Sequence, residues 1–220
     1  MDDTTQSMAQ PLLAIPDTDL ARRTVDLVTL AENPAIANHS IRSFLFARMF
    51  AGHEGAEAGR DYDADLLFLS CTLHDIGLSE AGNRRQRFEV DGADTAAEFL
   101  TARGLPAAEV DAVWEAIALH TSAHLAERRS TLCRLTSAGI SIDFGHDSEF
   151  ISDADGAAVH RAYPRYATAT SLVDAVVEQA RSRPEKAPAY SFTAELVRQR
   201  GLPDPVTTLE RRSSAGRWGN

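Results

Sequence analysis

The fold is decided by one stretch of the chain, residues 67–77, which reads LFLSCTLHDIG. The surrounding run 61–76 has helical character and is almost wholly apolar after its first turn. Such a helix is expected to lie in a protein core. Gly77 stands where a helix C-terminus is expected. We therefore predict a buried central helix that ends at the polar pair His74-Asp75.

The segments on either side of this stretch also carry apolar residues at helical spacing. No run of alternating strand pattern bounded by hairpin turns is visible, so we expect an all-α fold. One helix should follow the cap at Asp17-Thr18-Asp19, and another should start at Pro34. Further helices are expected over residues 93–100, 106–120, 132–142, 155–161, 171–180 and 191–199.

Length and composition favour one main domain. The chain has 220 residues, of which 44% are hydrophobic, and this fraction is ordinary for a globular protein and too high for a disordered one. We expect a flexible leader over residues 1–16, a domain over residues 17–200, and a C-terminal tail over residues 201–220. The tail is expected to be mobile or to pack against a partner.

Several functional classes are excluded at this stage. The net charge of −10 and the scattered basic residues argue against nucleic acid as a partner. The longest apolar stretch is interrupted and is shorter than the about 20 residues of a membrane span. The acidic N-terminus does not resemble a signal peptide. We expect a cytoplasmic protein, in which Cys71 and Cys133 are buried free thiols.

The pair His74-Asp75 is the strongest functional signal. Burying an imidazole and a carboxylate costs roughly several kcal/mol unless each is hydrogen-bonded or coordinated, and a divalent cation would satisfy both. His39, which lies mid-helix among apolar residues, and Asp143, which ends an apolar helix, are candidate donors from other segments. This mixed set of nitrogen and oxygen donors suits Zn²⁺, Fe²⁺ or Mn²⁺ better than Ca²⁺.

The flanking motifs are similar to a known family. His39, His74-Asp75 and Asp143 match the H…HD…D signature of the HD-domain superfamily of metal-dependent hydrolases. The similarity runs from about residue 20 to about residue 200. The motifs NHSIRS at 38–43, TLHDIG at 72–77, RFEVDGA at 87–93 and EAIALHT at 115–121 resemble the subgroup that contains the fungal cyanamide hydratases.

The resemblance implies an all-helical HD-domain bundle over residues 17–200 with a central metal site. It implies His39, His74, Asp75 and Asp143 as ligands of one divalent ion, with zinc expected first and iron or manganese as alternatives. It also implies a cytosolic enzyme that uses metal-bound water. The leading reaction is addition of water to the nitrile of cyanamide, which gives urea.

Three residues are candidates for catalysis. Asp75 could hold the metal and also orient the attacking water. His120 ends the predicted helix 106–120 and could transfer a proton or orient the substrate. A histidine in this region binds a second ion in two-metal members of the superfamily, and this alternative stays open. Glu89 is either an acceptor that fixes a histidine tautomer or simply a carboxylate at a helix start.

The other histidines have plainer interpretations. His124 is expected at the surface, although it would share a helix face with His120 if the helix continued. His53, His146 and His160 are interpreted as bystanders in loop-like or polar surroundings.

Two rival functions remain. A phosphohydrolase would need two metals or a basic pocket, and few Lys or Arg residues lie near the proposed ligands in sequence. A non-catalytic HD protein that binds a small ligand would have no need to keep all four metal-binding residues. The shortage of basic residues favours a small neutral molecule as the partner, and the sequence leaves self-association open.

Overall fold

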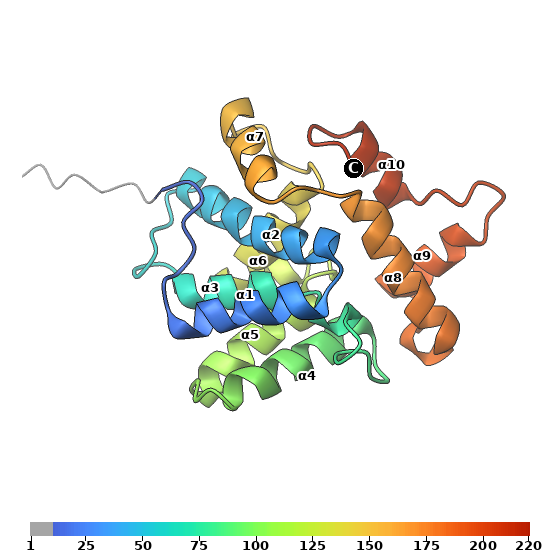
Figure 1. Cartoon of the computed structure of the whole chain (residues 1–220), viewed down its shortest axis with the longest axis horizontal. Helices are drawn as coiled ribbons and strands as arrows, with labels where there is room; N and C mark the ends of the chain where they lie inside the picture. Colours follow the sequence, from blue (N-terminus) through green and yellow to red (C-terminus); the bar gives the residue numbers. More distant parts are fainter. Residues whose placement is uncertain (1–10) are drawn as a thin grey trace, which may run out of the picture.

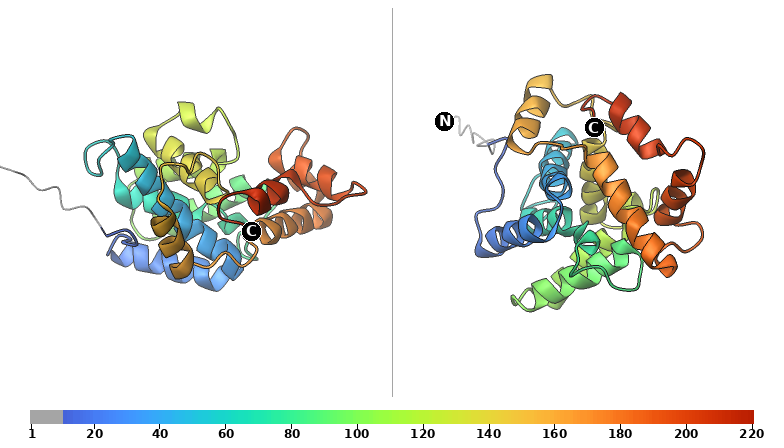
Figure 2. Two further views of the ribbon diagram at one scale, coloured as in Figure 1. Left: turned by 90° about the horizontal axis from the view of Figure 1, so that it is seen from above. Right: turned by 45° about the vertical axis from the view of Figure 1, so that its right-hand side comes forward.

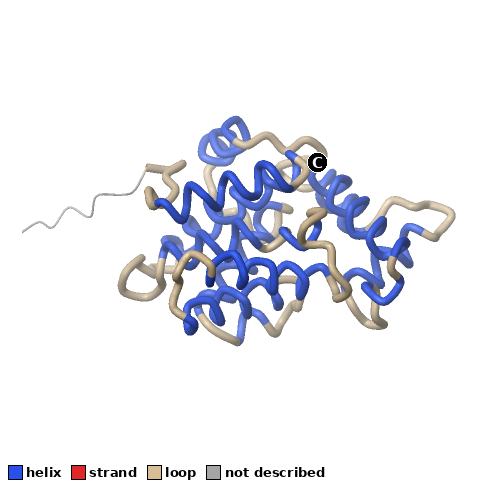
Figure 3. The backbone as a smooth tube through the Cα atoms, turned by 60° about the horizontal axis from the view of Figure 1, so that its bottom comes forward, coloured by secondary structure: helices blue, strands red, loops and turns tan. Residues whose placement is uncertain are grey.

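The computed structural model describes residues 11–220, so the first ten residues of the predicted leader lie outside the described part. Within it the chain forms helices and loops without a β-strand, which confirms the all-α prediction (Figure 3). The helices are α1 Asp19–Ala31, α2 Pro34–His53, α3 Ala64–Leu73, α4 Phe88–Thr101, α5 Ala107–Leu119, α6 Thr131–Asp143, α7 Asp153–Ala162, α8 Thr168–Ser182, α9 Phe192–Arg200 and α10 Thr208–Ala215.

Helices α2, α3 and α6 form the centre of the molecule, with α1, α4 and α5 packed around them (Figure 1). The crossing of α2 and α6 is close because Gly139 leaves room for it. A Cβ atom added at Gly139 would lie 2.2 Å from the carbonyl oxygen of Ser43. This approach places His39 of α2 beside the C-terminal end of α6.

The apolar helix α3 is shorter than the predicted run 61–76. Asp63 caps its start by accepting hydrogen bonds from the two backbone N–H groups of residues 65 and 66. All side chains from 67 to 73 are buried, as expected for a core helix. The helix ends before His74, and a short 3-10 turn, Ile76–Leu78, follows.

Gly77 is required by a close approach between segments. A Cβ atom at this position would lie 2.0 Å from the carbonyl oxygen of Phe88 and 2.7 Å from the backbone nitrogen of Gly92, both in α4. From the sequence, Gly77 was expected to end the preceding helix. The structure shows that it lets the start of α4 lie against the turn that carries Asp75.

Helices α8, α9 and α10 extend from one side of the bundle (Figure 2). Helix α10 falls in the predicted tail, where no helix was expected. Its start is fixed by a capping box in which Thr207 accepts from the backbone of Glu210 and the Glu210 carboxylate accepts from the backbone of Thr207. Beyond it, Trp218 stacks on Phe46 and donates to the carbonyl of Ile142.

Two further expectations concern single features. Cys71 and Cys133 are both buried and free, as predicted. Among the described residues, none of the helices combines the length and apolar character needed to cross a bilayer.

Candidate metal centre

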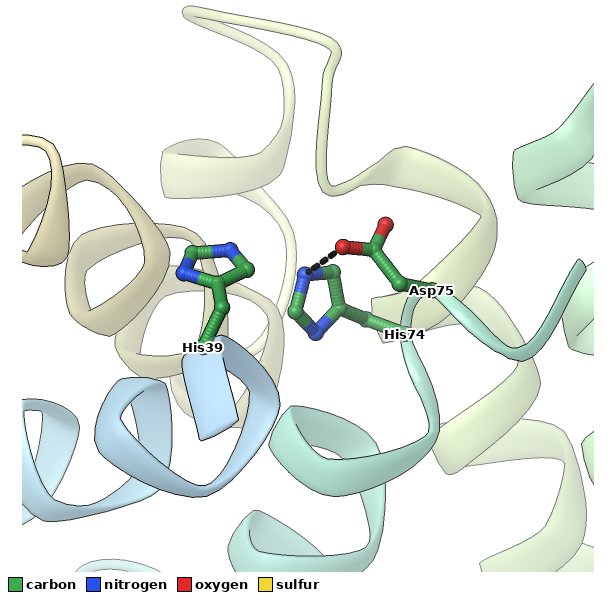
Figure 4. A group of neighbouring side chains, drawn as sticks. All are labelled: His39, His74 and Asp75. Atoms are coloured by element: carbon green, nitrogen blue, oxygen red, sulfur yellow. Dashed lines mark ion pairs between the residues drawn. The ribbon is translucent and has the colours of Figure 1, made fainter. Parts of the chain in front are cut away.

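Three polar side chains meet at the centre of the bundle. His39, His74 and Asp75 each offer a ligand atom, and these atoms all lie within 4.8 Å of one another. All three residues are buried. His39 comes from the second turn of α2, whereas His74 and Asp75 follow directly after α3, and their polar ends point toward one another (Figure 4). The structure therefore brings together three of the four expected ligands.

The hydrogen bonds of the ring nitrogens fix the tautomers at this site. Nδ1 of His39 lies 2.6 Å from Asp143 Oδ2. Nδ1 of His74 and Nδ1 of His120 each face the backbone carbonyl oxygen three residues earlier, at 2.7 and 2.6 Å. Carbonyl and carboxylate oxygens only accept, so in each ring Nδ1 carries the hydrogen. The Nε2 atom of each ring is therefore the one that can offer a lone pair when the ring is neutral.

These free atoms fit a bound cation. Nε2 of His39 and both carboxylate oxygens of Asp75 are buried without a hydrogen-bond partner among the described residues. Nε2 of His74 lies 3.1 Å from Asp75 Oδ2, which brings two electron-rich atoms together unless a proton or a cation lies between them. Although burial opposes ionisation, His74 lowers the pKa of Asp75 to about 2. An anionic carboxylate and imidazole nitrogens are ligands that a divalent ion prefers.

Asp143 lies on the far side of His39 and does not join the cluster. Its Oδ1 accepts from Arg42 Nε at 2.7 Å, and its Oδ2 accepts from an Arg42 terminal nitrogen at 2.8 Å. Arg165 adds a contact of 3.1 Å to Oδ1. Burial alone would raise the pKa of Asp143, but the charge of Arg42 and these hydrogen bonds hold it well below its usual range.

His120 lies beside the cluster, with Nε2 at 3.9 Å from Asp75 Oδ1. Its ring meets that of His74 edge-on, with centroids 4.9 Å apart. Burial, followed by the charge of His74, lowers the pKa of His120 to about 4. The ring is therefore neutral at pH 7 and presents an unprotonated Nε2 toward Asp75.

Glu89 is buried in the first turn of α4, and its hydrogen bonds go to Arg87 and Thr121. Both groups donate to Oε1, at 2.6 Å each. Glu89 thus anchors the residue that follows His120, and the three Nδ1 atoms at the site have other acceptors. Glu89 lies at a helix start, and none of the three Nδ1 atoms hydrogen-bonds to it in the structure.

A cavity of about 200 Å³ opens onto the cluster. Its walls are mostly apolar or aromatic, and among the described residues that line it none is Lys or Arg. Three wall residues, Leu172, Phe192 and Leu209, come from the C-terminal helices α8 and α10 and from the start of α9. The cavity is lined by His39, His74, Asp75, Phe88, His120, Thr121, Ala123, Glu127, Ser137, Ile140, Ser141, Phe144, His146, Leu172, Phe192 and Leu209.

His124 was expected at the surface, and His53, His146 and His160 were expected to be bystanders; the four differ in position. His124 and His53 are exposed. His146 is exposed but lines the cavity. His160 lies 3.6 Å from Asp143 Oδ1, so it borders the carboxylate behind His39. The sequence around His160, which lies in α7, does not indicate that its side chain lies close to Asp143.

Arg42 lies in the motif at residues 38–43, but neither it nor Arg165 was identified as a site residue from the sequence. A signal for Arg42 was present in its spacing. Residues three apart share a helix face, so Arg42 lies on the same side of α2 as His39. A charged side chain on an otherwise buried face requires a buried partner.

Comparison with known proteins agrees with this geometry. A search of curated proteins finds no match. A family model described as HD domain matches residues 36–180, more than half of the 220-residue chain. The matched region contains His39, the pair His74-Asp75 and Asp143 in the expected order. HD domains bind divalent metal ions, and their members are typically metal-dependent hydrolases. The chain belongs to the HD-domain family.

Proposed function

We propose that this protein is a metal-dependent hydratase that adds water to a small neutral molecule, with the nitrile of cyanamide as the leading substrate. The observation that carries the proposal is the cavity: it ends at the cluster of His39, His74 and Asp75 and has no Lys or Arg among its described lining residues. A phosphate ester would bring negative charge into a site that already holds Asp75 and Glu127.

The residues fit one divalent ion, with zinc as the first expectation and iron or manganese as alternatives. Nε2 of His39, Nε2 of His74 and a carboxylate oxygen of Asp75 would hold it. When bound, such an ion lowers the pKa of a water molecule and supplies a nucleophile near neutral pH. Asp143 was expected as a fourth ligand, but its carboxylate is paired with Arg42 and Arg165.

His120 is proposed to carry the proton. Hydration of a nitrile forms a bond from the water oxygen to carbon and requires a proton on nitrogen. The neutral ring holds its own proton on Nδ1 against the carbonyl of Ile117, so Nε2 accepts the proton that the water gives up. It then returns this proton to the substrate nitrogen, and tautomerisation gives urea.

Asp75 and Glu89 support this transfer in different ways. Oδ1 of Asp75 lies 3.9 Å from His120 Nε2, so Asp75 can orient the attacking water with a hydrogen toward that nitrogen. Glu89 binds the hydroxyl of Thr121 and thereby holds the turn that carries His120. Glu89 is thus a positioning residue in this proposal.

The test is to load the purified protein with Zn²⁺, Fe²⁺ or Mn²⁺ and to measure urea release from cyanamide together with metal stoichiometry. We expect one ion per chain and turnover with at least one metal. His74→Ala should lose both metal and activity and keep its helical circular dichroism, since the apolar core is complete without an ion. A metal-replete protein that gives no urea contradicts the substrate.

The main rival is a phosphohydrolase, as the family assignment alone would suggest. The same preparation should therefore be assayed with nucleoside monophosphates and a generic phosphate ester. Two ions per chain together with phosphate release would favour the rival. Urea release with one ion would favour the hydratase.

A further inference from the structure

We propose that Asp143 acts on the metal centre through His39, as a positioning residue that fixes the His39 tautomer, and is not itself bound to the metal. The inference rests on the proposed metal site, but it is independent of the substrate. The observation behind it is that Asp143 Oδ2 lies 2.6 Å from Nδ1 of His39, while the unpartnered nitrogen of the same ring, Nε2, belongs to the cluster with His74 and Asp75.

The carboxylate of Asp143 is already fully engaged. Arg42 forms a bidentate pair with it, in which Nε donates to Oδ1 and a terminal nitrogen donates to Oδ2. Arg165 donates to Oδ1 of Asp143 and also to the backbone carbonyl of Asp143. Such paired, charge-assisted bonds are stronger and more directional than neutral ones.

The arginines are themselves held in place. Arg42 is fully buried and donates further to the carbonyls of Tyr163 and Pro164 and to the hydroxyl of Thr168. Arg165 also donates to Ser213 in α10. If Asp143 turned toward the cluster, two buried guanidinium groups would lose their carboxylate. Removing one partner of a buried ion pair is strongly destabilising.

The arrangement has a chemical purpose. A carboxylate on the outer nitrogen of a metal-binding histidine fixes the ring orientation and the tautomer, and it makes the inner nitrogen a stronger ligand. His74 obtains its tautomer from a backbone carbonyl that the helix supplies. The His39 ring instead donates from Nδ1 to the carboxylate of Asp143, the last residue of α6. The backbone carbonyl of His39 accepts from the hydroxyl of Ser43. Asp143 thereby couples α6 to the metal.

The deciding experiment is a structure of the zinc-loaded wild-type protein with the metal located by anomalous scattering. We expect Zn²⁺ bonded to His39, His74 and Asp75, with Asp143 still paired to Arg42. A zinc–oxygen bond to Asp143 of about 2.0–2.2 Å, the ordinary length for a carboxylate ligand, would overturn the inference. Absence of bound zinc in the wild type would instead overturn the metal site itself, so the two failures are distinguishable.

Variants provide a second, independent readout. Zinc affinity should be measured by competition with a chromophoric chelator in Asp143→Asn, Arg42→Lys and Asp75→Asn. An asparagine oxygen can still accept from His39 Nδ1, so we expect Asp143→Asn to weaken zinc binding by about 10- to 100-fold. Arg42→Lys, which loses the two-point grip, should fall in the same range. Asp75→Asn should abolish stoichiometric binding.

The matched control is Arg87→Lys, which alters another arginine–carboxylate pair that does not touch a cluster histidine. It should leave zinc affinity unchanged. The Co²⁺-loaded Asp143→Asn protein should retain the visible absorption of the wild type, because the ligand set is the same. Loss of zinc in Asp143→Asn as complete as in Asp75→Asn would contradict the inference. If the variants do not fold, the wild-type structure decides.

Discussion

At the scale of single residues, the unusual feature is how many buried polar groups lie near Asp75. Glu32, which follows α1, is one of them: it is 8% exposed, and neither carboxylate oxygen has a hydrogen-bond partner among the described residues. Burial, followed by the charge of Asp75, raises the pKa of Glu32 well above its usual range. The folded protein thus keeps a proton that the unfolded chain releases above about pH 4.3.

This difference predicts a pH-dependent loss of stability. The contribution of Glu32 to the unfolding free energy should fall as pH rises from about 4.3 toward its raised pKa, by up to about 1.4 kcal/mol per pH unit. Glu32→Gln has no such ionisation, so its unfolding free energy should rise relative to that of the wild type as pH rises. Urea unfolding at several pH values between 4 and 8 measures this gap, which is the difference in unfolding free energy between the variant and the wild type. Glu80→Gln, at an exposed position, is the control. A gap that is constant with pH contradicts the prediction.

The residue scale also shows what spacing can reveal. His39, His74 and Asp75 were identified from the sequence because each interrupts an apolar helical run, and a buried polar group requires a partner. The role of Asp143 was not accessible in this way. The sequence indicates that a carboxylate ends α6, but it does not indicate which nitrogen of His39 it meets. That depends on Arg42 and Arg165 converging from two other segments.

At the scale of elements, the core of each helix was predictable and its ends were less so. The predicted helix over 93–100 begins at residue 88 in the structure, five residues earlier than expected. Helix α10 was missed because the sequence TLERRSSA has almost no apolar face. The capping box between Thr207 and Glu210 was the signal that could have found it.

The crossing of α2 and α6 gives an element-scale prediction. A Cβ at Gly139 would lie 2.2 Å from the carbonyl of Ser43 and 2.6 Å from the Cβ of Ala47, so the helices would have to separate. We expect Gly139→Ala to lower the unfolding free energy by about 1–3 kcal/mol and to weaken zinc binding, because His39 and Asp143 lie on the two helices.

The matched control is Gly52→Ala, near the end of α2. A Cβ there meets nothing within 4 Å, and the backbone φ is not positive. Alanine should stabilise the protein by up to about 1 kcal/mol by restricting the unfolded chain. Chemical denaturation of both variants measures the contrast, and destabilisation of similar size in the two would show that the helix crossing is not the cause.

At the scale of the whole molecule, the group formed by His39, His74 and Asp75 lies where two apolar cores meet. The first fills the bundle of α1 to α6, and the second gathers around α8 and includes Phe88, Phe144 and Leu196. The family model ends at residue 180, so α9 and α10 lie beyond it. The cavity therefore has a wall that is not part of the matched HD domain.

This wall should set the size of the substrate. Phe192, at the start of α9, and Leu209 in α10 both line the cavity. Truncating either one to alanine enlarges the space in front of the cluster without touching His39, His74 or Asp75. We expect Phe192→Ala to raise kcat/KM for bulkier nitriles relative to cyanamide by about 10-fold or more, since one methylene group in an apolar pocket already provides about 10-fold discrimination.

The comparison requires a control that loses an aromatic ring elsewhere. Phe99 lies in α4 outside the cavity, where the guanidinium of Arg103 covers its ring at 3.6 Å. Phe99→Ala should change stability but leave the ratio of kcat/KM between nitriles unchanged, and both variants should keep one metal ion. If Phe192→Ala changes the ratio no more than Phe99→Ala, the C-terminal helices do not select the substrate. Selection would then belong to the residues of the matched domain, among which Phe88 and Phe144 line the same cavity.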